Sequence, residues 1–535
     1  LVERALRLEA DATDLLEQLS GVEAVAVTLL YGFERAAEEA AIAEAIRSAR
    51  PDLAVSLSSE VVAEFREFER TATTVLNAYL MPETGRYLSE LVTRAKAVGL
   101  PAEIQVMRSS GGLMPIRDAA ALPASILLSG PAGGVVAASA IGEALGRSRL
   151  VSFDMGGTST DVCRIDNGRP EVAYERAVAG YPCRMPAVAV HTVGAGGGSV
   201  GWVDDGGSLR VGPRSSGAVP GPACYGNGAL EPAVTDANVV LGRIDPGGRL
   251  AGSLPILPQL AADAMAAIGD RLRLDVPAAA LGMVEVIEEV MAGAIRAVSI
   301  EQGADPRRAA LIAFGGAGGL HATALARKLG MAGAVIPPYS GVFSALGLLL
   351  SPPRIDAARS VLLARGDDLD RAVASVVNES SDRLAAGGST AQATSGFADV
   401  RYRGQSHETT VPYEPGAGWD VLVERFHAMH LERNGFARQG DPVEVVTVRA
   451  ESVGRSLLTW GDLPEVQPVG VPERGSRTVL TATGAVEAAV FDRSGLASGT
   501  EVVGPAIIEE TEATTYLSPG ERALVHSSGA LEVEW

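Results

Sequence analysis

The sequence predicts an α/β protein in which helices cover a substantially parallel sheet, followed by a β-rich C-terminal domain. Up to about residue 360, apolar runs of strand length alternate with helical stretches. Beyond that point the sequence consists mainly of short apolar runs typical of β-strands. Gly-rich segments also follow several strands, where a bare backbone can approach a ligand. With 535 residues, 47% of them hydrophobic and 21% charged, the chain is expected to be globular and to form several domains.

The elements are expected in the following order. An amphipathic helix at 1–21 precedes a β-α-β unit, whose parts are a strand at 22–30, a helix at 34–51 and a strand at 53–59. The next elements are a helix at 68–98, strands at 103–112 and 124–134, a helix at 134–146 and a strand from 150. Helices at 257–270 and 278–302 then precede a strand at 311–314 and a helix running through Lys328. β-type runs at 397–413, 443–454 and 504–517 surround one helix at 419–434.

Three domains follow from this pattern. They are an α/β domain at 1–147, a second α/β domain at 148–360 that contains Gly-rich segments, and a C-terminal α+β domain at 361–535. Between 187 and 248 the density of Gly and Pro is typical of turns and of loops that surround a ligand.

Charge and composition exclude several classes of protein. A net charge of −20 without a long Lys/Arg run argues against nucleic acid and an anionic membrane as partners. Three Cys without metal or redox spacing indicate a reducing cytoplasm. The uncharged stretch 119–142 is long enough to span a bilayer, but Pro123, Pro131 and its glycines favour a buried strand, turn and helix.

The segment "FDMGGTSTDV", 153–162, is the strongest candidate for a ligand site. A strand that ends at Asp154 and turns through Gly156 and Gly157 can bring backbone N–H groups close to a phosphate. Further donors come from the hydroxyls of Thr158, Ser159 and Thr160. Asp154 and Asp161 are placed to hold Mg²⁺ and neutralise an oligophosphate. The alternative is a β-hairpin turn at Gly156–Gly157 that Asp154 caps.

Two other Gly-rich junctions strengthen the phosphate interpretation. "FGGAGGLHA", 314–322, follows a strand, and its Gly315, Gly316, Gly318 and His321 are candidates for contact with a nucleotide's base or sugar. "LSGPAGGV", 128–135, offers another helix N-terminus. Neither segment is a Walker A motif, because no GK[ST] follows, and neither matches GxGxxG.

Other polar residues carry weaker hypotheses. His191 precedes the "GAGGGS" loop and is a candidate catalytic residue, with a structural hydrogen bond as the alternative. Cys224 is either a small buried hydrophobic residue or a nucleophile. Cys163 and Cys183 are weaker candidates for a nucleophile. Arg108 has two interpretations, contact with an anionic substrate group or pairing with an acidic neighbour. The charged helix 64–74, with Arg66, Glu67, Glu69 and Arg70, is expected to present a solvated or interface face. Asp236 and Asn238 are expected to cap a helix or hold a loop, and are secondary candidates for the ligand site.

Six segments in order give the chain a resemblance to the hydantoinase A/5-oxoprolinase family. They are "FDMGGTSTDV", "HTVGAGGGSV", "GPACYGNG", "VTDANVVLGR", "FGGAGGLHA" and "RYRGQSHE". The resemblance implies an actin-like, sugar-kinase-like ATPase fold with two ribonuclease H-type lobes and nucleotide in the cleft. It also implies ATP with Mg²⁺ as cofactors, a cyclic amide such as a hydantoin or 5-oxoproline as substrate, activation by phosphorylation of the amide oxygen, and a B-type subunit as partner in a hetero-oligomer.

The resemblance leaves alternatives open. Family members begin with another DxGGTxTD segment, whereas this chain carries one copy, at 154–161, so we expect a first-lobe segment before Leu1 to be absent and nucleotide binding by this chain alone to be weak. A carboxylase β subunit that acts on a ketone enol or bicarbonate is the nearest alternative within the family. A truncated, non-catalytic assembly partner and a metabolite kinase are the others.

Overall fold

The computed structural model of the protein describes residues 19–100, 103–250, 252–464 and 467–535. The chain folds into two compact units, each built from three stretches of sequence. The first unit contains residues 1–132, 172–188 and 351–457, and the second contains 133–171, 189–350 and 458–535. The three domains predicted from the sequence follow chain order and stay a prediction. The helix predicted at 1–21 lies almost wholly outside the described residues.

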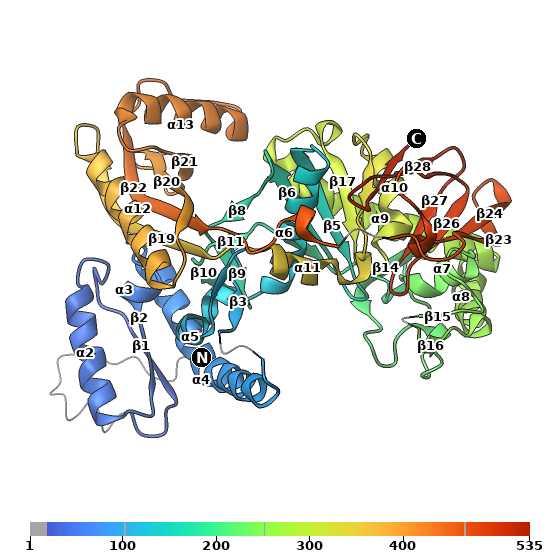
Figure 1. Cartoon of the computed structure of the whole chain (residues 1–535), viewed down its shortest axis with the longest axis horizontal. Coiled ribbons are helices and arrows are strands. Elements are labelled where there is room, and N and C mark those ends of the chain that lie inside the picture. The colour runs from blue at the N-terminus through green and yellow to red at the C-terminus, as the bar shows by residue number, and fades with distance from the viewer. Residues whose placement is uncertain (1–18, 101–102, 251, 465–466) are drawn as a thin grey trace. The chain divides into compact units, whose positions relative to one another are not determined.

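The first unit begins with the predicted β-α-β arrangement. Strands β1 (Ala24–Val27) and β2 (Ala54–Leu57) pair in parallel, and α2 (Ala36–Ala49) connects them (Figure 1). Ile46 of the helix packs with Val27 and Leu57 of the strands in a small core. The long helix α4 (Glu67–Ala97) lies where one was predicted at 68–98, and β3 (Gln105–Met107) falls within the run predicted as a strand.

A four-stranded antiparallel sheet completes the first unit. Its order is β19 (Arg354–Ala364), β22 (Val443–Gly454), β20 (Ala391–Tyr402) and β21 (Thr409–Pro412). Helix α13 (Gly418–Asn434) was predicted, but α12 (Leu369–Ala386) was missed. Its buried Leu369, Val373, Val376 and Leu384 follow helical spacing, so the pattern was readable in the sequence.

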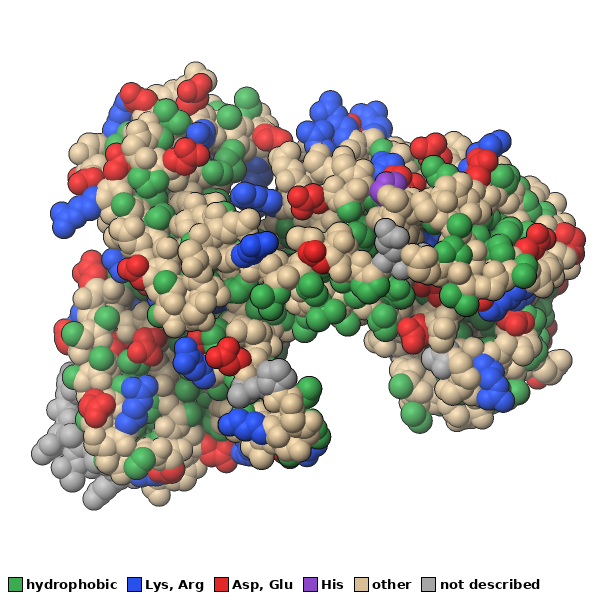
Figure 2. All heavy atoms as spheres, viewed as in Figure 1, with side chains coloured by type: hydrophobic (Ala, Val, Ile, Leu, Met, Phe, Trp, Pro, Cys, Tyr) green, Lys and Arg blue, Asp and Glu red, His purple; other side chains and the backbone are tan. Residues whose placement is uncertain are grey.

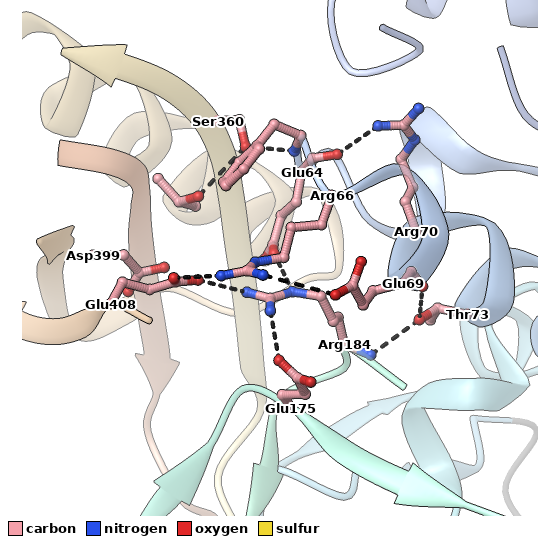
Figure 3. A network of polar contacts seen from close by, with 12 residues as sticks. Glu64, Arg66, Glu69, Arg70, Thr73, Glu175, Arg184, Ser360, Asp399 and Glu408 are labelled. Atoms are coloured by element: carbon pink, nitrogen blue, oxygen red, sulfur yellow. Dashed lines mark hydrogen bonds and ion pairs between the residues drawn. The ribbon is translucent and has the colours of Figure 1, made fainter. Parts of the chain in front are cut away.

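Buried ion pairs connect the three stretches of the first unit (Figure 3). The buried carboxylate of Glu64 accepts a hydrogen bond from Nε of Arg184 and lies 2.8 Å from Nη2 of Arg449. Arg184 also contacts Glu175 at 2.8 Å, and Arg449 contacts the buried Asp399 at 2.8 Å. Because these residues come from each stretch of the unit, the network fixes how its parts pack together.

Two predictions for charged residues of the first unit are settled by this packing. Arg70 is fully buried and donates to the carbonyl oxygens of Glu64 and Leu29, so the prediction of a solvated or interface helix face is wrong at this position. Arg108 is buried, and its guanidinium lies 3.3 Å from the carboxylate of Asp356. Of its two interpretations, the structure therefore supports pairing with an acidic neighbour.

The second unit is organised around a nine-stranded mixed sheet. Its main path is β12 (His191–Val193), β6 (Thr160–Asp166), β5 (Arg149–Met155), β17 (Ala310–Phe314), β18 (Ala334–Ile336), β29 (Leu531–Glu534), β28 (Arg522–Val525) and β25 (Glu501–Val503), with β7 (Arg169–Pro170) paired to β6. The pairs β5–β17 and β17–β18 are parallel and the other pairs are antiparallel. The predicted, substantially parallel sheet is therefore wrong, because several strands connect through hairpins.

The C-terminal region is β-rich, as predicted, but its strands are distributed over different sheets. Those between 354 and 454 form the sheet of the first unit. In the second unit, β25, β28 and β29 extend the nine-stranded sheet, while β23 (Glu473–Thr481), β24 (Gly484–Asp492), β26 (Ala506–Glu509) and β27 (Thr514–Leu517) form a four-stranded sheet.

Helices α7 (Val234–Val240), α8 (Pro258–Leu272), α9 (Val276–Val298) and α10 (Gly318–Lys328) also belong to the second unit (Figure 1). Apolar side chains of α9 and α10, including Met283, Ile287 and Leu325, pack in one core with Phe153 and Leu311 of the central strands. This core holds the ends of β5 and β17 in fixed positions.

Residues 123–144 differ from the sequence prediction. The strand predicted at 124–134 is wrong, because Pro123–Ile126 form a 3₁₀ turn and α6 begins at Ser129 (Ser129–Ala144). Glycine allows this helix to approach α11 (Phe343–Leu350) closely, since a Cβ on Gly133 would lie 2.6 Å from the carbonyl oxygen of Ser344. Within the described ranges, no helix combines the length and apolarity needed to cross a membrane.

Acidic and basic side chains are interspersed on the face shown in Figure 2.

Candidate functional site

The "DMGGTST" segment forms a β-hairpin in the second unit. Strand β5 ends at Met155, β6 begins at Thr160, and Asp154 lies opposite Asp161 in the antiparallel register. The hairpin alternative is therefore confirmed as the local structure. At the turn, Gly157 and Thr158 are exposed, and a Cβ on Gly157 would have open space around it. The hairpin thus presents bare backbone at its tip, which keeps the phosphate hypothesis open.

The "GAGGGS" loop packs directly on this turn. The amide of Gly197 donates to the carbonyl of Gly156 at 3.0 Å, and the amide of Gly198 donates to that of Gly157 at 2.6 Å. A Cβ on Gly196 would lie 2.7 Å from backbone atoms of Thr158. Glycine is required here because two stretches of backbone are in contact.

The junction between β17 and α10 meets the end of β5 in a similar way. Gly315 has φ +80°, and a Cβ there would lie 2.4 Å from the carbonyl oxygen of Met155 and 2.6 Å from Oδ1 of Asp154. The amide of Ala317 donates to the carbonyl of Met155 at 3.2 Å. Gly318 lies in the first turn of α10. The predicted strand-to-helix junction is confirmed.

A cavity of about 860 Å³ opens where the three Gly-rich segments meet. Gly156, Gly157, Gly197 and Gly316 all line it, and we call it the glycine cavity. Its wall also contains aromatic and charged side chains from other parts of the second unit: Tyr225, Asp245, Arg249, Tyr339, Arg474, Asp492, Arg493, Glu509, Glu510 and Glu512. The volume falls within the range of small-molecule sites.

Asp154 and Asp161 face each other beside the cavity, although neither lines it. Burial raises the pKa of Asp154 to about 6, and the charge of Asp161 adds to this, while a 3.2 Å hydrogen bond from Oγ of Ser344 opposes it. Burial also raises the pKa of Asp161, against a hydrogen bond from Thr192 at 2.5 Å. Cross-strand partners point to the same face of a sheet, so the two carboxylates form a pair.

This pair fits a hydrated Mg²⁺, which takes one or two carboxylates together with water and phosphate oxygens. Among the described residues, no cluster of three or more His, Cys, Asp or Glu side chains is arranged to enclose a metal without such outside ligands. A metal here would depend on the phosphate for the rest of its coordination.

The remaining predicted site residues lie in different surroundings. Thr160 is buried and its hydroxyl donates to the carbonyl of Ala195, whereas Ser159 stays half-buried in the turn. His191 is exposed on β12, opposite Val162, and does not line the cavity. His321 is fully buried, with Nδ1 3.0 Å from Oε1 of Glu288. The structure therefore places both histidines away from the cavity wall.

The structural readings of Cys224 and Asp236 fit their surroundings. The carboxylate of Asp236 accepts hydrogen bonds from the amides of Ala223, Cys224 and Ala233, at 2.8 to 3.0 Å, and so fixes the turn before α7. Cys224 is fully buried, and burial raises the pKa of its thiol, which opposes a nucleophilic role. Asn238 donates to the carbonyl of Val234 and also lines the cavity.

Three of the cavity residues that sequence reasoning missed have unusual surroundings. Tyr339 has φ +58°, which is uncommon for a tyrosine, and it is half-exposed at the cavity. Glu510 accepts a hydrogen bond from the amide of Ser340 at 3.3 Å, and burial raises its pKa. Arg493 is buried in the wall. The acidic run "IEETE" was a signal for the carboxylates, but no local pattern marks the arginine or the tyrosine.

Comparison with known proteins adds to this geometry. The sequence profile of the Hydantoinase/oxoprolinase family matches residues 70–357, and that of the Hydantoinase/oxoprolinase C-terminal domain matches residues 396–532. The chain is 32% identical to caprolactamase subunit alpha of Pseudomonas jessenii, with 96% of this chain and 76% of the relative aligned. It is 31% identical to 5-oxoprolinase 1 of Arabidopsis thaliana, over 96% of this chain and 42% of that longer protein.

Solved structures agree with these matches. The crystal structure of ATP-dependent caprolactamase from Pseudomonas jessenii superposes with a TM-score of 0.87 and 31% identity, over 97% of this chain and 78% of the other. A nucleotide-free acetone carboxylase superposes with a TM-score of 0.73 and 24% identity, over 98% of this chain and 77% of the other, which supports the fold alone.

Proposed function

The chain belongs to the hydantoinase/oxoprolinase family, and from this premise we propose that it is an ATP-dependent hydrolase subunit acting on cyclic amides. The observation that carries the proposal is the meeting of three Gly-rich backbones, at Gly156, Gly197 and Gly316, in one cavity. The names of the relatives support the substrate class, since one is a caprolactamase subunit and others are 5-oxoprolinases. The fold expected from the resemblance is the fold observed.

The turn of the hairpin is suited to an oligophosphate. Within the described part of the chain, the amides of Gly157 and Thr158 have no hydrogen-bond acceptor, and both residues are exposed. They can therefore donate to phosphate oxygens without breaking an existing bond. The bonds from Gly197 and Gly198 hold the turn in place, so little backbone order would be lost on binding.

ATP, when bound, supplies the phosphoryl group that activates the amide oxygen of the substrate for attack by water. The chain's own contribution is to position and neutralise the phosphates, since phosphoryl transfer depends mainly on these two effects. We assign positioning to the amides of Gly157 and Thr158, and assign to Asp154 and Asp161 the task of holding Mg²⁺. His191, exposed near the "GAGGGS" loop, stays a candidate for contact with the substrate.

A second subunit of the B type is part of the proposal. The caprolactamase relative is a subunit by name. From this resemblance we infer that the present chain carries out the reaction together with a partner chain. The hetero-oligomer and a cytoplasmic location belong to the same proposal.

A substrate panel tests the proposed function. The chain, supplied with a B-type partner subunit, is incubated with MgATP and 5-oxoproline, hydantoin, caprolactam, or acetone plus bicarbonate, and both ADP and the organic product are measured. We expect ADP release that depends on a cyclic amide and yields its ring-opened acid. ADP release with acetone and bicarbonate alone would identify a carboxylase instead, and ATP binding without any turnover would favour the non-catalytic alternative.

A further inference from the structure

Arg493 is a buried cation that lacks an ion pair. Only 7% of its surface is exposed, and among the described residues no carboxylate lies within ion-pair distance of its guanidinium. Nη2 donates to the carbonyl of Gly529, while Nη1 is buried without a hydrogen-bond partner. The neighbouring Asp492 is occupied by Arg474 and by the amide and hydroxyl of Ser494.

Other buried arginines of the chain are compensated differently. Arg184, Arg354 and Arg449 each contact two or more carboxylates. A buried charge without a partner destabilises the folded state, because the protein does not replace the water that the charge has lost. Arg493 thus departs from the pattern by which this protein buries arginine, and such departures are typical of functional sites.

The position of Arg493 connects it with the Gly-rich segments. It lines the glycine cavity, as do its neighbours Asp492 and Ser494. The charge of Glu510 acts on Arg493 by raising its pKa, and the carboxylate of Glu510 accepts a hydrogen bond from the amide of Ser340. The carbonyl of Ser340 in turn accepts from the amide of Gly315 at 2.9 Å. Ser340 therefore connects Glu510, which shares the cavity wall with Arg493, to the junction that packs on the end of β5.

We infer that Arg493 binds an anionic oxygen group of the molecule that occupies the glycine cavity. This group is a phosphate of the nucleotide or a carboxylate of an acidic substrate, because guanidinium recognises both by the same charge-assisted hydrogen bonds. The inference rests on the proposed function for the identity of the occupant. It adds to the cavity wall a buried cationic contact from the C-terminal stretch of the second unit, where Arg474 is already paired with Asp492.

The electrostatics of the cavity wall support this role. Burial lowers the pKa of Arg493 to about 10, with Glu510 opposing the change, so the side chain stays protonated at neutral pH although it is desolvated. Glu509, Glu510 and Glu512 make this part of the wall acidic. An anion would meet repulsion there unless a cation such as Arg493 contacts it directly.

The test compares Arg493→Gln and Arg493→Met with wild-type protein and with Arg522→Gln. Arg522 is a matched control, since it lies in the same C-terminal stretch and has the same charge, but it is exposed and paired with Glu501. Calorimetry gives dissociation constants for ATP, AMP and adenosine, each with Mg²⁺, and for 5-oxoproline and uncharged caprolactam. Thermal unfolding without ligand gives the melting temperature of each variant.

If the anion is a phosphate, both Arg493 variants weaken ATP binding about 10-fold or more and leave adenosine unchanged. If it is a carboxylate, they weaken 5-oxoproline binding by a similar factor and leave ATP and caprolactam unchanged. In either case the melting temperature of Arg493→Met equals or exceeds that of wild type, since an uncompensated buried charge has been removed.

Wild-type affinity for every anionic ligand in both Arg493 variants would overturn the inference while leaving the proposed function intact. A lower melting temperature in Arg493→Met with unchanged binding would also overturn it, because it would identify the arginine as structural. Failure of the wild-type protein to bind ATP would instead contradict the proposed function, and binding of 5-oxoproline would then decide whether the role of Arg493 survives.

Discussion

A Cβ atom on Gly315 would lie 2.4 Å from the carbonyl oxygen of Met155. This one distance connects the junction before α10 to the end of the strand that carries Asp154, and it explains why the two segments can line the same cavity. The left-handed φ of +80° adds a second requirement for glycine at this position.

Gly315→Ala should therefore lower the free energy of unfolding by about 2 kcal/mol or more, since it combines left-handed strain with a backbone overlap. Urea denaturation measures the change. Gly157→Ala is the matched control, because its Cβ would meet nothing within 4 Å, and we expect it to stay within about 0.5 kcal/mol of wild type. Equal losses in the two variants would contradict the packing described for Gly315.

Asp154→Asn should stabilise the unliganded protein at neutral pH. The folded-state pKa of about 6 lies above the usual value, so folding favours the protonated carboxyl. The stability that this group contributes is present below its unfolded-state pKa of about 4 and is lost as the pH rises through about 6. The gain from the neutral amide should reach up to about 3 kcal/mol at pH 7 to 8 and vanish near pH 3.

The same substitution should weaken MgATP binding more than binding of ATP with excess EDTA, because a metal ligand has been removed. Thermal scans at several pH values and calorimetry measure both effects. A variant that gains stability and binds both forms of ATP as wild type does would remove Asp154 from the metal site.

Glu64→Gln should be strongly destabilising, by about 3 to 5 kcal/mol, since it leaves Arg184 and Arg449 without a full countercharge in a buried position. Burial alone would raise the pKa of Glu64, but Arg449 and Arg184 hold it below its usual value, so the carboxylate is ionised at neutral pH. The exposed pair Glu38–Arg35 provides the control, and Glu38→Gln should unfold at the same urea concentration as wild type, because an exposed ion pair contributes little to stability.

Cys224→Ser tests the nucleophile reading. Because the thiol is buried and the turn is held by Asp236, we expect turnover with the partner subunit to stay within about threefold of wild type, with a loss of roughly 1 kcal/mol in stability from the buried hydroxyl. A complete loss of turnover in a folded variant would restore Cys224 as a candidate nucleophile.

His191→Ala tests the other catalytic candidate. The side chain is exposed, so its removal should leave the melting temperature unchanged. If it takes part in proton transfer, turnover should fall about 100-fold or more. Unchanged turnover in the complete assembly would assign His191 to the surface.

Sequence patterns predicted those parts of the site that depend on local backbone. The strand before Asp154, the bare turn at Gly156–Gly157 and the junction at Gly315 were all recognisable, because glycine and strand-length apolar runs are local signals. The same reasoning failed at 124–134, where an apolar run with Pro and Gly reads equally as a strand or as the start of a helix.

Sequence patterns did not reveal contacts between residues that lie far apart in the chain. Arg493 becomes notable only when its burial and lack of an ion pair are known. Arg70 looked solvated because the sequence shows its neighbour Glu67 but not the backbone carbonyls of Glu64 and Leu29 that it also contacts. His321 shows the reverse case, in which a residue inside a recognisable motif turns inward to Glu288.

The central claim is that the hairpin turn at Gly157 and Thr158 binds an oligophosphate. A crystal structure of the protein with Mg²⁺ and a non-hydrolysable ATP analogue tests it most directly. We predict phosphate oxygens within about 3.2 Å of the amide nitrogens of both residues, with the metal between the phosphates and Asp154 or Asp161. A nucleotide bound outside the glycine cavity, with this turn still free, would contradict the account.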